Sequence, residues 1–183
     1  MILTKNTFRK KCLQKMNNRL QNSFVYESKV INKKILKILN NVKGKNILFY
    51  YPMKTEVDIR KSLLHLRKNN NIFLPFMENE SFKIVTFRLP LQKKKFGIYE
   101  AGNSLRKIKK IDIAIVPVVG VDGNLQRIGF GKGMYDRYFK KLNTKPYTIF
   151  IQPRTCFTKK LVCDHYDVKG DLLITADKRD IKI

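Results

Sequence analysis

The segment Gly120 to Asp136, GVDGNLQRIGFGKGMYD, holds the residues whose types and spacing could most directly do chemistry. Five of the nine glycines of the chain lie in it, an apolar run ends just before it, and a helix is predicted to begin at Met134. Glycines let backbone N–H groups approach an anion closely, and a helix N-terminus adds partial positive charge. Arg127 and Lys132 add two full charges. The segment therefore predicts a phosphate-binding loop, although a structural turn would also use these glycines.

The spacing excludes two familiar phosphate loops. A Walker A loop requires Ser or Thr after its lysine, and here Lys132 is followed by Gly133. A dinucleotide fingerprint requires a third glycine where this chain has Met134. Asp136 is the nearby carboxylate, and a carboxylate beside bound phosphates is a natural Mg²⁺ ligand.

The whole string resembles the signature of the 5-formyltetrahydrofolate cyclo-ligase family, also called 5,10-methenyltetrahydrofolate synthetases. The resemblance is carried by Asp122-Gly123, by residues 127–133 (RIGFGKG) and by Tyr135-Asp136-Arg137. Ile128 replaces a leucine of the family pattern, and Met134 replaces its first tyrosine, which removes a ring and a hydroxyl from the implied folate pocket.

The resemblance implies an ATP site. Lys5 and Arg9 match a family K-x-x-x-R motif, and their spacing places both on one stripe of a predicted helix over residues 4–21. In so basic a chain, a solvated helix face is the alternative. The implied nucleotide-binding residues are Lys5, Arg9, Arg127, Ile128, Gly129, Phe130, Gly131, Lys132, Gly133, Met134 and Tyr135. Lys132, Arg127 and Tyr135 are the implied catalytic residues.

The resemblance also implies a folate site after the first predicted strand, residues 46–51. Glu56-Val57-Asp58 matches a family E-[IVL]-[DE]-T segment, with Ile59 in place of the threonine. The alternative is a capping box, Thr55-x-x-Asp58, at the start of a helix, in which Glu56 is a first-turn acid. The implied substrate-binding residues are Tyr51, Glu56, Phe130, Gly131, Lys132, Gly133 and Met134.

Two carboxylates, Asp136 and Asp167, are the implied Mg²⁺ ligands. The match to the family's closing segment could be displaced so that Asp164, and not Asp167, is the second ligand. Asp167 could instead be a turn residue before a strand. The implied reaction converts 5-formyltetrahydrofolate and MgATP to 5,10-methenyltetrahydrofolate, ADP and phosphate, by phosphorylation of the formyl oxygen and ring closure.

The net charge of +25 suggests nucleic acid as a partner. Only ten of the 39 basic residues are arginines, and the basic residues are spread along the whole chain. The chain is also rich in asparagine, so a compositional drift towards Lys and Asn is the preferred explanation of the charge. Three alternatives to the cyclo-ligase stay open: a nucleic-acid-binding protein, another nucleotide or sugar-phosphate enzyme, and a weakened family member that only binds nucleotide.

Alternating strand and helix patterns predict an α/β fold. We expect three layers, with an open, largely parallel sheet, helices on both faces and two N-terminal helices (4–21 and 23–41) before the first strand. The length favours a single domain over residues 1–183, and we expect a monomer. No apolar run approaches the roughly 18 residues of a membrane span, and no signal peptide is evident, so we expect a cytoplasmic protein. Cys12, Cys156 and Cys163 are expected to be free thiols, with a pairing of Cys156 and Cys163, seven residues apart, as the alternative.

Overall fold

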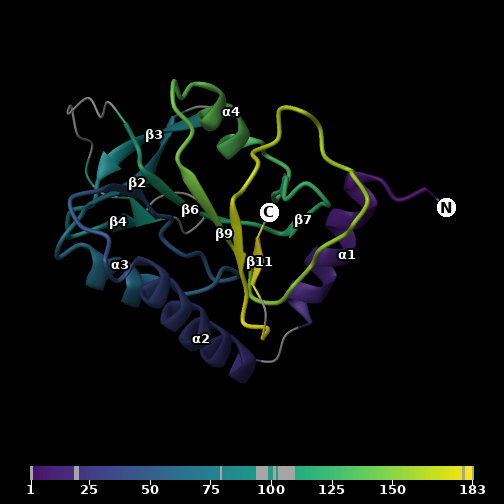
Figure 1. Ribbon diagram of the computed structural model, residues 1–183, viewed down its shortest axis with the longest axis horizontal. Helices are drawn as coiled ribbons and strands as arrows, with labels where there is room; N and C mark the ends of the chain where they lie inside the picture. Colours follow the sequence, from purple (N-terminus) through teal and green to yellow (C-terminus); the bar gives the residue numbers. More distant parts are fainter. Residues whose placement is uncertain are drawn as a thin grey trace.

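The computed structural model describes residues 2–18, 21–78, 80–93, 99–100, 102, 110–178 and 180–182. A seven-stranded open sheet forms the middle layer (Figure 1). From one edge to the other, its strands are β11 (Ile181–Lys182), β10 (Leu172–Ile174), β9 (Tyr147–Ile151), β6 (Ile113–Pro117), β1 (Asn46–Leu48), β2 (Asn71–Glu78) and β3 (Ser81–Thr86). The inner strands are parallel to one another, and β3 and β11 are antiparallel to their neighbours. The predicted largely parallel sheet is confirmed.

Helices cover both faces of this sheet. α2 (Gln21–Leu39) and α3 (Arg60–Leu66) lie on one face and α4 (Met134–Lys140) on the other (Figure 1). Strand β6 shows the consequence, because all five of its residues are buried. Ile113 and Ile115 pack into the cluster beneath α2, whereas Ala114 and Val116 pack into the cluster beneath α4. Such a continuous apolar run is typical of a parallel strand that is covered on both faces.

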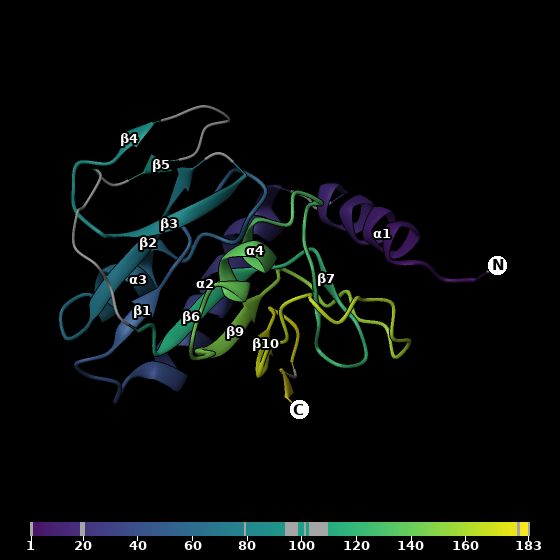
Figure 2. The same ribbon diagram turned by 90° about the horizontal axis from the view of Figure 1, so that it is seen from above.

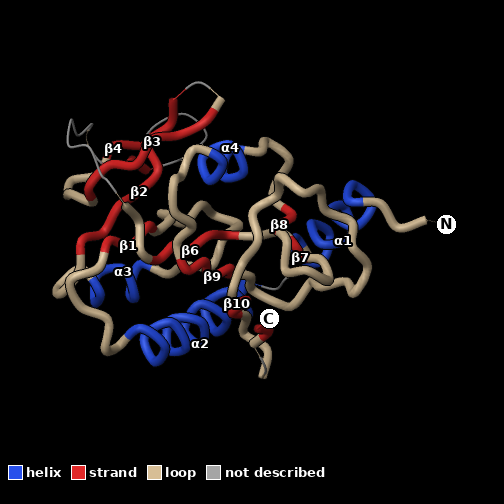
Figure 3. The backbone as a smooth tube through the Cα atoms, turned by 45° about the horizontal axis from the view of Figure 1, so that its top comes forward, coloured by secondary structure: helices blue, strands red, loops and turns tan. Residues whose placement is uncertain are grey.

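Helix α1 (Lys5–Asn17) lies apart from these layers, beside a small hairpin of β7 (Gly120–Val121) and β8 (Arg127–Ile128) (Figures 2 and 3). Thr4 caps the helix by accepting a hydrogen bond from the Thr7 backbone N–H at 3.2 Å. Phe8 and Cys12, one turn apart, are buried against the hairpin. Both predicted N-terminal helices are confirmed, and the glycine-rich segment begins as a hairpin rather than as one continuous loop.

Two local predictions differ from the structure. The Thr55-x-x-Asp58 capping box does not form, because α3 begins later, at Arg60; the Asp58 carboxylate instead accepts hydrogen bonds from the Arg60 backbone N–H at 3.0 Å and from its guanidinium. Strand β1 ends at Leu48, three residues before the predicted end. A two-stranded sheet, β4 (Gln92–Lys93) with β5 (Tyr99–Glu100), completes the elements of the described chain. Within the described ranges, no helix has the length and apolar character needed to cross a bilayer.

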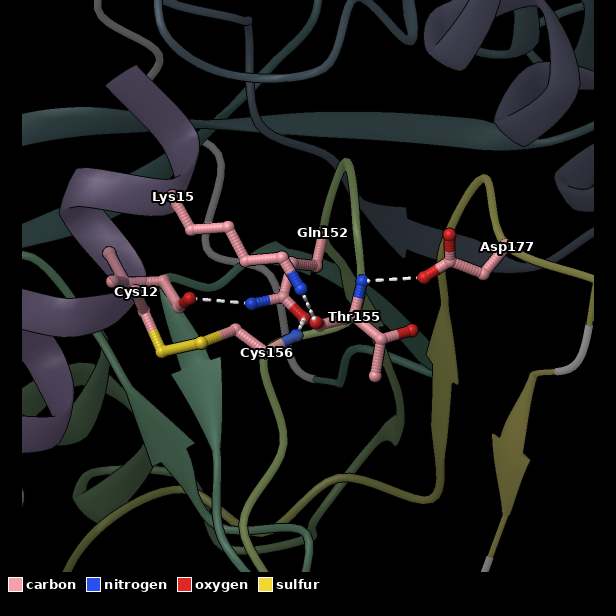
Figure 4. Close-up of a disulfide and its surroundings, with 7 residues drawn as sticks. Cys12, Lys15, Gln152, Thr155, Cys156 and Asp177 are labelled. Atoms are coloured by element: carbon pink, nitrogen blue, oxygen red, sulfur yellow. Dashed lines mark hydrogen bonds between the residues drawn. A yellow bond between two sulfur atoms is a disulfide. The ribbon is translucent and has the colours of Figure 1, made fainter. Parts of the chain in front are cut away.

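The expectation of three free thiols is wrong for two of them. Cys12 of α1 and Cys156, which follows β9, form a disulfide across 144 residues of sequence (Figure 4). Nearby, the Lys15 ammonium donates to the Thr155 carbonyl at 2.7 Å, so the helix is held to the same loop twice. Sequence spacing gave no sign of this pairing because the two cysteines meet only through the packing of α1 on the hairpin. Cys163 is free of any disulfide.

We expect removal of this disulfide by Cys12→Ala with Cys156→Ala to lower the free energy of unfolding by about 3 kcal/mol, since a cross-link over so long a loop restricts the unfolded chain. Urea unfolding without reductant measures the loss, and Cys163→Ala is the control. Reductant should lower the stability of the wild type towards that of the double variant. A double variant no less stable than Cys163→Ala would contradict the expectation.

Candidate functional site

The candidate site lies where the sheet changes its direction of winding. From β1 the chain adds β2 on one side, and it later returns to place β6 on the other side of β1. Ligands of open α/β sheets bind outside the carboxyl ends of strands at such a switch point. The segment after β1 carries Glu56, and the segment after β6 carries Arg127 and Asp136. The two parts of the predicted site thus come from the two strands that flank the switch point.

Arg127 is the buried centre of the site, with only 6% of its surface exposed. Its Nε donates to the Pro117 carbonyl at 3.2 Å, its Nη1 lies 3.9 Å from Asp136 Oδ2, and its guanidinium stands 4.8 Å from the centre of the Tyr135 ring. Gly129 closes over it, because a Cβ there would lie 2.3 Å from Arg127 Nη1. Burial lowers the pKa of Arg127, and Asp136 opposes that change. The side chain lies beneath the loop and contacts the residues that surround the pocket.

Glu56 is a buried carboxylate on the other side of the switch point. It is 6% exposed, and its Oε2 accepts a hydrogen bond from the Met53 backbone N–H at 2.9 Å. Burial raises the pKa of Glu56 to about 7, against the lowering effects of the Met53 N–H and of Arg127. Burial raises the pKa of the Tyr50 and Tyr135 phenols, and the charge of Glu56 adds to the effect on both. The group can therefore exchange a proton with a ligand near neutral pH.

Glu56→Gln should change the pH dependence of stability. The folded-state pKa of Glu56 lies above its ordinary value of 4.5, so the folded protein holds the proton more tightly between about pH 4.5 and 7. This contribution to stability is full below that window and is lost as pH rises through it, by on the order of 3 kcal/mol. Urea unfolding of wild type and variant at pH 5 and pH 7.5 measures the difference between them. Relative to wild type, the glutamine variant should be more stable at pH 7.5 than at pH 5. A stability difference that does not change with pH would contradict the raised pKa of Glu56.

Lys5 and two aspartates form a charged cluster beside the loop. The Lys5 ammonium contacts the carboxylate of Asp167 and lies 3.1 Å from Asp164 Oδ2. The Asp167 side chain is only 3% exposed and also accepts the Asp164 backbone N–H at 2.7 Å, whereas Asp164 is exposed. These contacts raise the pKa of Lys5 against the effect of its burial, and Lys5 lowers the pKa of Asp164. Of the two candidate aspartates, Asp167 is the one that is buried in the groove wall.

Asp136 reaches the same cluster from the first turn of α4. Its Oδ1 accepts a hydrogen bond from the Val168 backbone N–H at 3.2 Å, directly after Asp167. Among the described residues, no group of three or more His, Cys, Asp or Glu side chains could hold a metal ion. Two carboxylates in one groove still fit Mg²⁺, which commonly takes one or two carboxylates and completes its shell with phosphate oxygens and water.

A groove of about 1260 Å³ joins these groups. The predicted ATP and metal residues on its wall are Lys5, Arg9, Arg127, Gly129, Gly131, Gly133, Asp136 and Asp167. Gly131 and Gly133 have φ values of 109° and 59°, which favour glycine. Arg9 is held in place, since its Nε donates to the Gly129 carbonyl at 2.9 Å. The structure thus brings together the N-terminal helix, the glycine loop and the C-terminal aspartate.

The other predicted residues do not line this groove. Ile128 is fully buried against α1, so only its backbone could contact a ligand. Tyr51 lines a separate cavity on the α2–α3 side. Met134 and Tyr135 pack partly into the core beneath α4, whereas Phe130 and Lys132 are exposed on the loop.

Sequence reasoning missed several residues of the groove. Gln126 donates from Nε2 to the Asp164 carbonyl at 2.7 Å, and the Tyr166 hydroxyl bonds the Asp164 carboxylate at 3.0 Å. Lys140, Lys145 and Lys169 also line the groove and make its wall basic. Their positions in the sequence could have indicated Gln126 and Tyr166, because Gln126 is next to Arg127 and Tyr166 is next to Asp167.

Comparison with known proteins indicates a single enzyme family. A model of the 5-formyltetrahydrofolate cyclo-ligase family matches residues 2–176. The chain is 29% identical to the 5-formyltetrahydrofolate cyclo-ligase of Mycoplasma pneumoniae over 180 residues, which cover 96% of this chain and all of that protein. It is 24% identical to the Haemophilus influenzae protein of the same name, over 73% of this chain and 76% of that one.

Comparison with solved structures indicates the same family. The fold is similar to that of the 5,10-methenyltetrahydrofolate synthetase of Aquifex aeolicus, with a TM-score of 0.77 and 26% identity over 98% of this chain and 93% of that one. The Mycoplasma pneumoniae synthetase matches with a TM-score of 0.74 and 26% identity over 96% of this chain and all of that one.

Proposed function

The chain belongs to the 5-formyltetrahydrofolate cyclo-ligase family of enzymes, and we propose that it converts 5-formyltetrahydrofolate and MgATP to 5,10-methenyltetrahydrofolate, ADP and phosphate. The observation that supports this most is the convergence of a glycine loop, basic side chains and two carboxylates in one groove beside a buried glutamate at the switch point. The glycine loop and the basic side chains would bind phosphates, the two carboxylates a metal ion, and the glutamate a ring with N–H groups.

ATP would occupy the groove with its phosphates over the Gly129–Gly133 backbone. Lys5, Arg9 and Lys132 would neutralise the phosphate oxygens, since a lysine supplies a mobile point charge and an arginine a planar fork. Lys5 now contacts two aspartates, so phosphate binding would exchange one anionic partner for another.

Asp136 and Asp167 would hold Mg²⁺. When bound, this ion would neutralise charge on the transferring phosphoryl group. Arg127 would hold Asp136 and Tyr135 in place from beneath, and Gly129 provides the space that this buried guanidinium needs.

The folate ring would lie against Glu56. An ionised carboxylate accepts hydrogen bonds from ring N–H groups, and the raised pKa of Glu56 lets it also donate when protonated. Glu56 and Arg127 are both buried, so the part of the site next to the folate ring would be shielded from water.

The chemistry then requires mainly positioning. The formyl oxygen attacks the γ-phosphorus, the bond to ADP breaks, and the formyl carbon becomes an iminium carbon that carries a phosphate leaving group. The neighbouring folate amine attacks this carbon and loses its proton, and phosphate departs as the five-membered ring closes.

Lys132→Ala tests the ATP assignment. We expect the KM for ATP to rise at least about ten-fold, or turnover to be lost, because a phosphate contact is removed, while the exposed position leaves the fold intact. Lys141→Ala, the same change at an exposed lysine after α4 and outside the glycine loop, is the control. Steady-state kinetics at varied ATP, with a circular dichroism check of folding, measure both. Unchanged kinetics in Lys132→Ala would remove Lys132 from the site.

A further inference from the structure

Asp122 belongs to the glycine-rich segment, but it does not line the groove. It is fully buried, and a buried carboxylate requires hydrogen-bond donors for both of its oxygens. Oδ1 accepts the backbone N–H groups of Asn124 and Gln126, each at 3.0 Å. Oδ2 accepts those of Val162 at 3.2 Å and Cys163 at 3.1 Å. Four backbone N–H groups from two distant segments therefore converge on one side chain.

The two segments are the β7–β8 hairpin and a long loop. Residues 122–126 form the turn of the hairpin, so Oδ1 closes this turn from within. Val162 and Cys163 lie in residues 152–171, which join β9 to β10 and form no helix or strand. Figure 2 shows this loop, in yellow-green, beside β7. A loop of this length without secondary structure is uncommon in a compact domain and is usually functional.

This loop carries Asp164 and Asp167, the aspartates of the charged cluster. Without secondary structure of its own, the loop depends on other segments to satisfy its backbone polar groups. Asp122 binds it just before the cluster, and the Gln126 amide donates to the Asp164 carbonyl at 2.7 Å. The Arg127 backbone N–H donates to the carbonyl of the residue after Asp167, at 2.8 Å. The hairpin thus holds the loop on both sides of Asp167.

Gly123 shows how closely the hairpin and the loop pack. A Cβ at this position would lie 2.3 Å from the Lys159 carbonyl oxygen, so a side chain would push the two segments apart. The Gly123 backbone N–H donates to the Lys160 carbonyl at 3.4 Å. Positions 122 and 123 therefore hold the residue types that this contact requires: a short carboxylate that accepts N–H groups, and a residue without a side chain.

We propose that Asp122 is a positioning residue for the Mg²⁺ site, a role that rests on the proposed function. Its carboxylate bonds the hairpin and the loop to each other and so keeps Asp167 in the same groove as Asp136. Asp122 contacts neither metal ion nor substrate, since it is buried outside the groove. The hairpin that precedes the glycine loop therefore also places the second carboxylate of the site.

Asp122→Asn tests this role, because asparagine keeps one acceptor oxygen and presents an NH₂ group where the other oxygen accepted two N–H groups. The Mg²⁺ concentration for half-maximal rate should rise about ten-fold, as is common when a residue that orients a metal ligand is lost. The KM for 5-formyltetrahydrofolate should stay within about two-fold, since the proposed folate contact, Glu56, lies on the other side of the switch point. Asp122→Ala, which removes both acceptors, should raise the Mg²⁺ requirement further.

Two other variants separate this role from a general loss of stability. Gln126→Ala removes the amide contact to the same loop from a half-buried position, so it should fold and raise the Mg²⁺ requirement in the same direction. Leu74→Ala leaves a cavity in the core at β2, away from the hairpin and the loop. It should lower the free energy of unfolding in urea and leave the half-saturating Mg²⁺ concentration unchanged, because loss of folded protein lowers the rate equally at every Mg²⁺ concentration.

Mn²⁺ binding in the presence of ADP, followed by electron paramagnetic resonance, measures the metal site without turnover. The affinity should weaken about ten-fold in Asp122→Asn and be retained in Leu74→Ala. If wild type turns over, an unchanged Mg²⁺ requirement and Mn²⁺ affinity in folded Asp122→Asn, or in Gln126→Ala where Asp122→Asn does not fold, would overturn the role of Asp122 and leave the proposed function standing. Absence of turnover in wild type would overturn the proposed function, and the Mn²⁺ titration would then decide the role of Asp122. A wild type that binds no Mn²⁺ would overturn that role together with the metal assignment.

Discussion

Asp136→Asn is expected to lower kcat/KM by about 10²–10³, because it removes one of the two carboxylates that we propose as Mg²⁺ ligands, where the transferring phosphoryl group would gain charge. Asparagine keeps an oxygen that can accept the Val168 backbone N–H, so the fold should survive. Initial rates at varied Mg²⁺ and ATP measure the loss, and the Mg²⁺ concentration for half-maximal rate should rise.

Asp112→Asn is the matched control for this variant. Asp112 also accepts a backbone N–H, from Asn46 at 2.9 Å, but it lies at the amino end of β6, far from the switch point. Its replacement should leave kcat/KM within about two-fold of wild type. Asp167→Asn should resemble Asp136→Asn, and the double variant should lose little more than either, since groups that act as a unit are not additive. A fully active Asp136→Asn enzyme would contradict the metal assignment.

Arg127→Met is expected to impair both stability and turnover. It removes the buried counter-charge of Asp136, the donor to the Pro117 carbonyl and the contact with the Tyr135 ring. The free energy of unfolding should fall by about 2–4 kcal/mol, because the buried Pro117 carbonyl loses its donor and the partly buried Asp136 carboxylate loses a nearby positive charge. Urea unfolding measures this change, and kcat should fall at least about ten-fold even when ATP is saturating.

Arg127→Lys separates the contribution of positive charge at this position from that of the guanidinium shape. It restores positive charge but not the planar fork, so it should recover more stability than turnover. The same variants test the link to Glu56: Arg127 lowers the pKa of that carboxyl, so the pKa should rise above about 7 in Arg127→Met. An Arg127→Met enzyme with the turnover of wild type would show that Arg127 does not position the site.

The layers of the fold could be predicted because their signals are local. Thr4 and the four-residue spacing of Phe8 and Cys12 define α1, and the apolar run of β6 identifies a strand covered on both faces. The glycine loop could be placed after β6 for the same reason, and the structure joins it to Lys5 and Asp167 in one groove.

The remaining features depend on contacts between distant segments. Arg127 appears in the sequence as a loop cation ready for phosphate, but packing buries it beneath Gly129. Ile128 faces α1 because adjacent strand residues point to opposite sides, which the sequence pattern alone could have indicated. The Cys12–Cys156 bond and the place of Tyr51 in the separate cavity on the α2–α3 side needed the three-dimensional structure.

The near-ultraviolet absorbance of the methenyl product tests the central claim most directly. Folded protein with 5-formyltetrahydrofolate, ATP and Mg²⁺ should give a steady rise that disappears when any one of the three is omitted, together with one ADP for each methenyl group formed. A flat trace with all three present, from protein that still binds ATP, would contradict the proposed reaction and indicate a family member that retains only nucleotide binding.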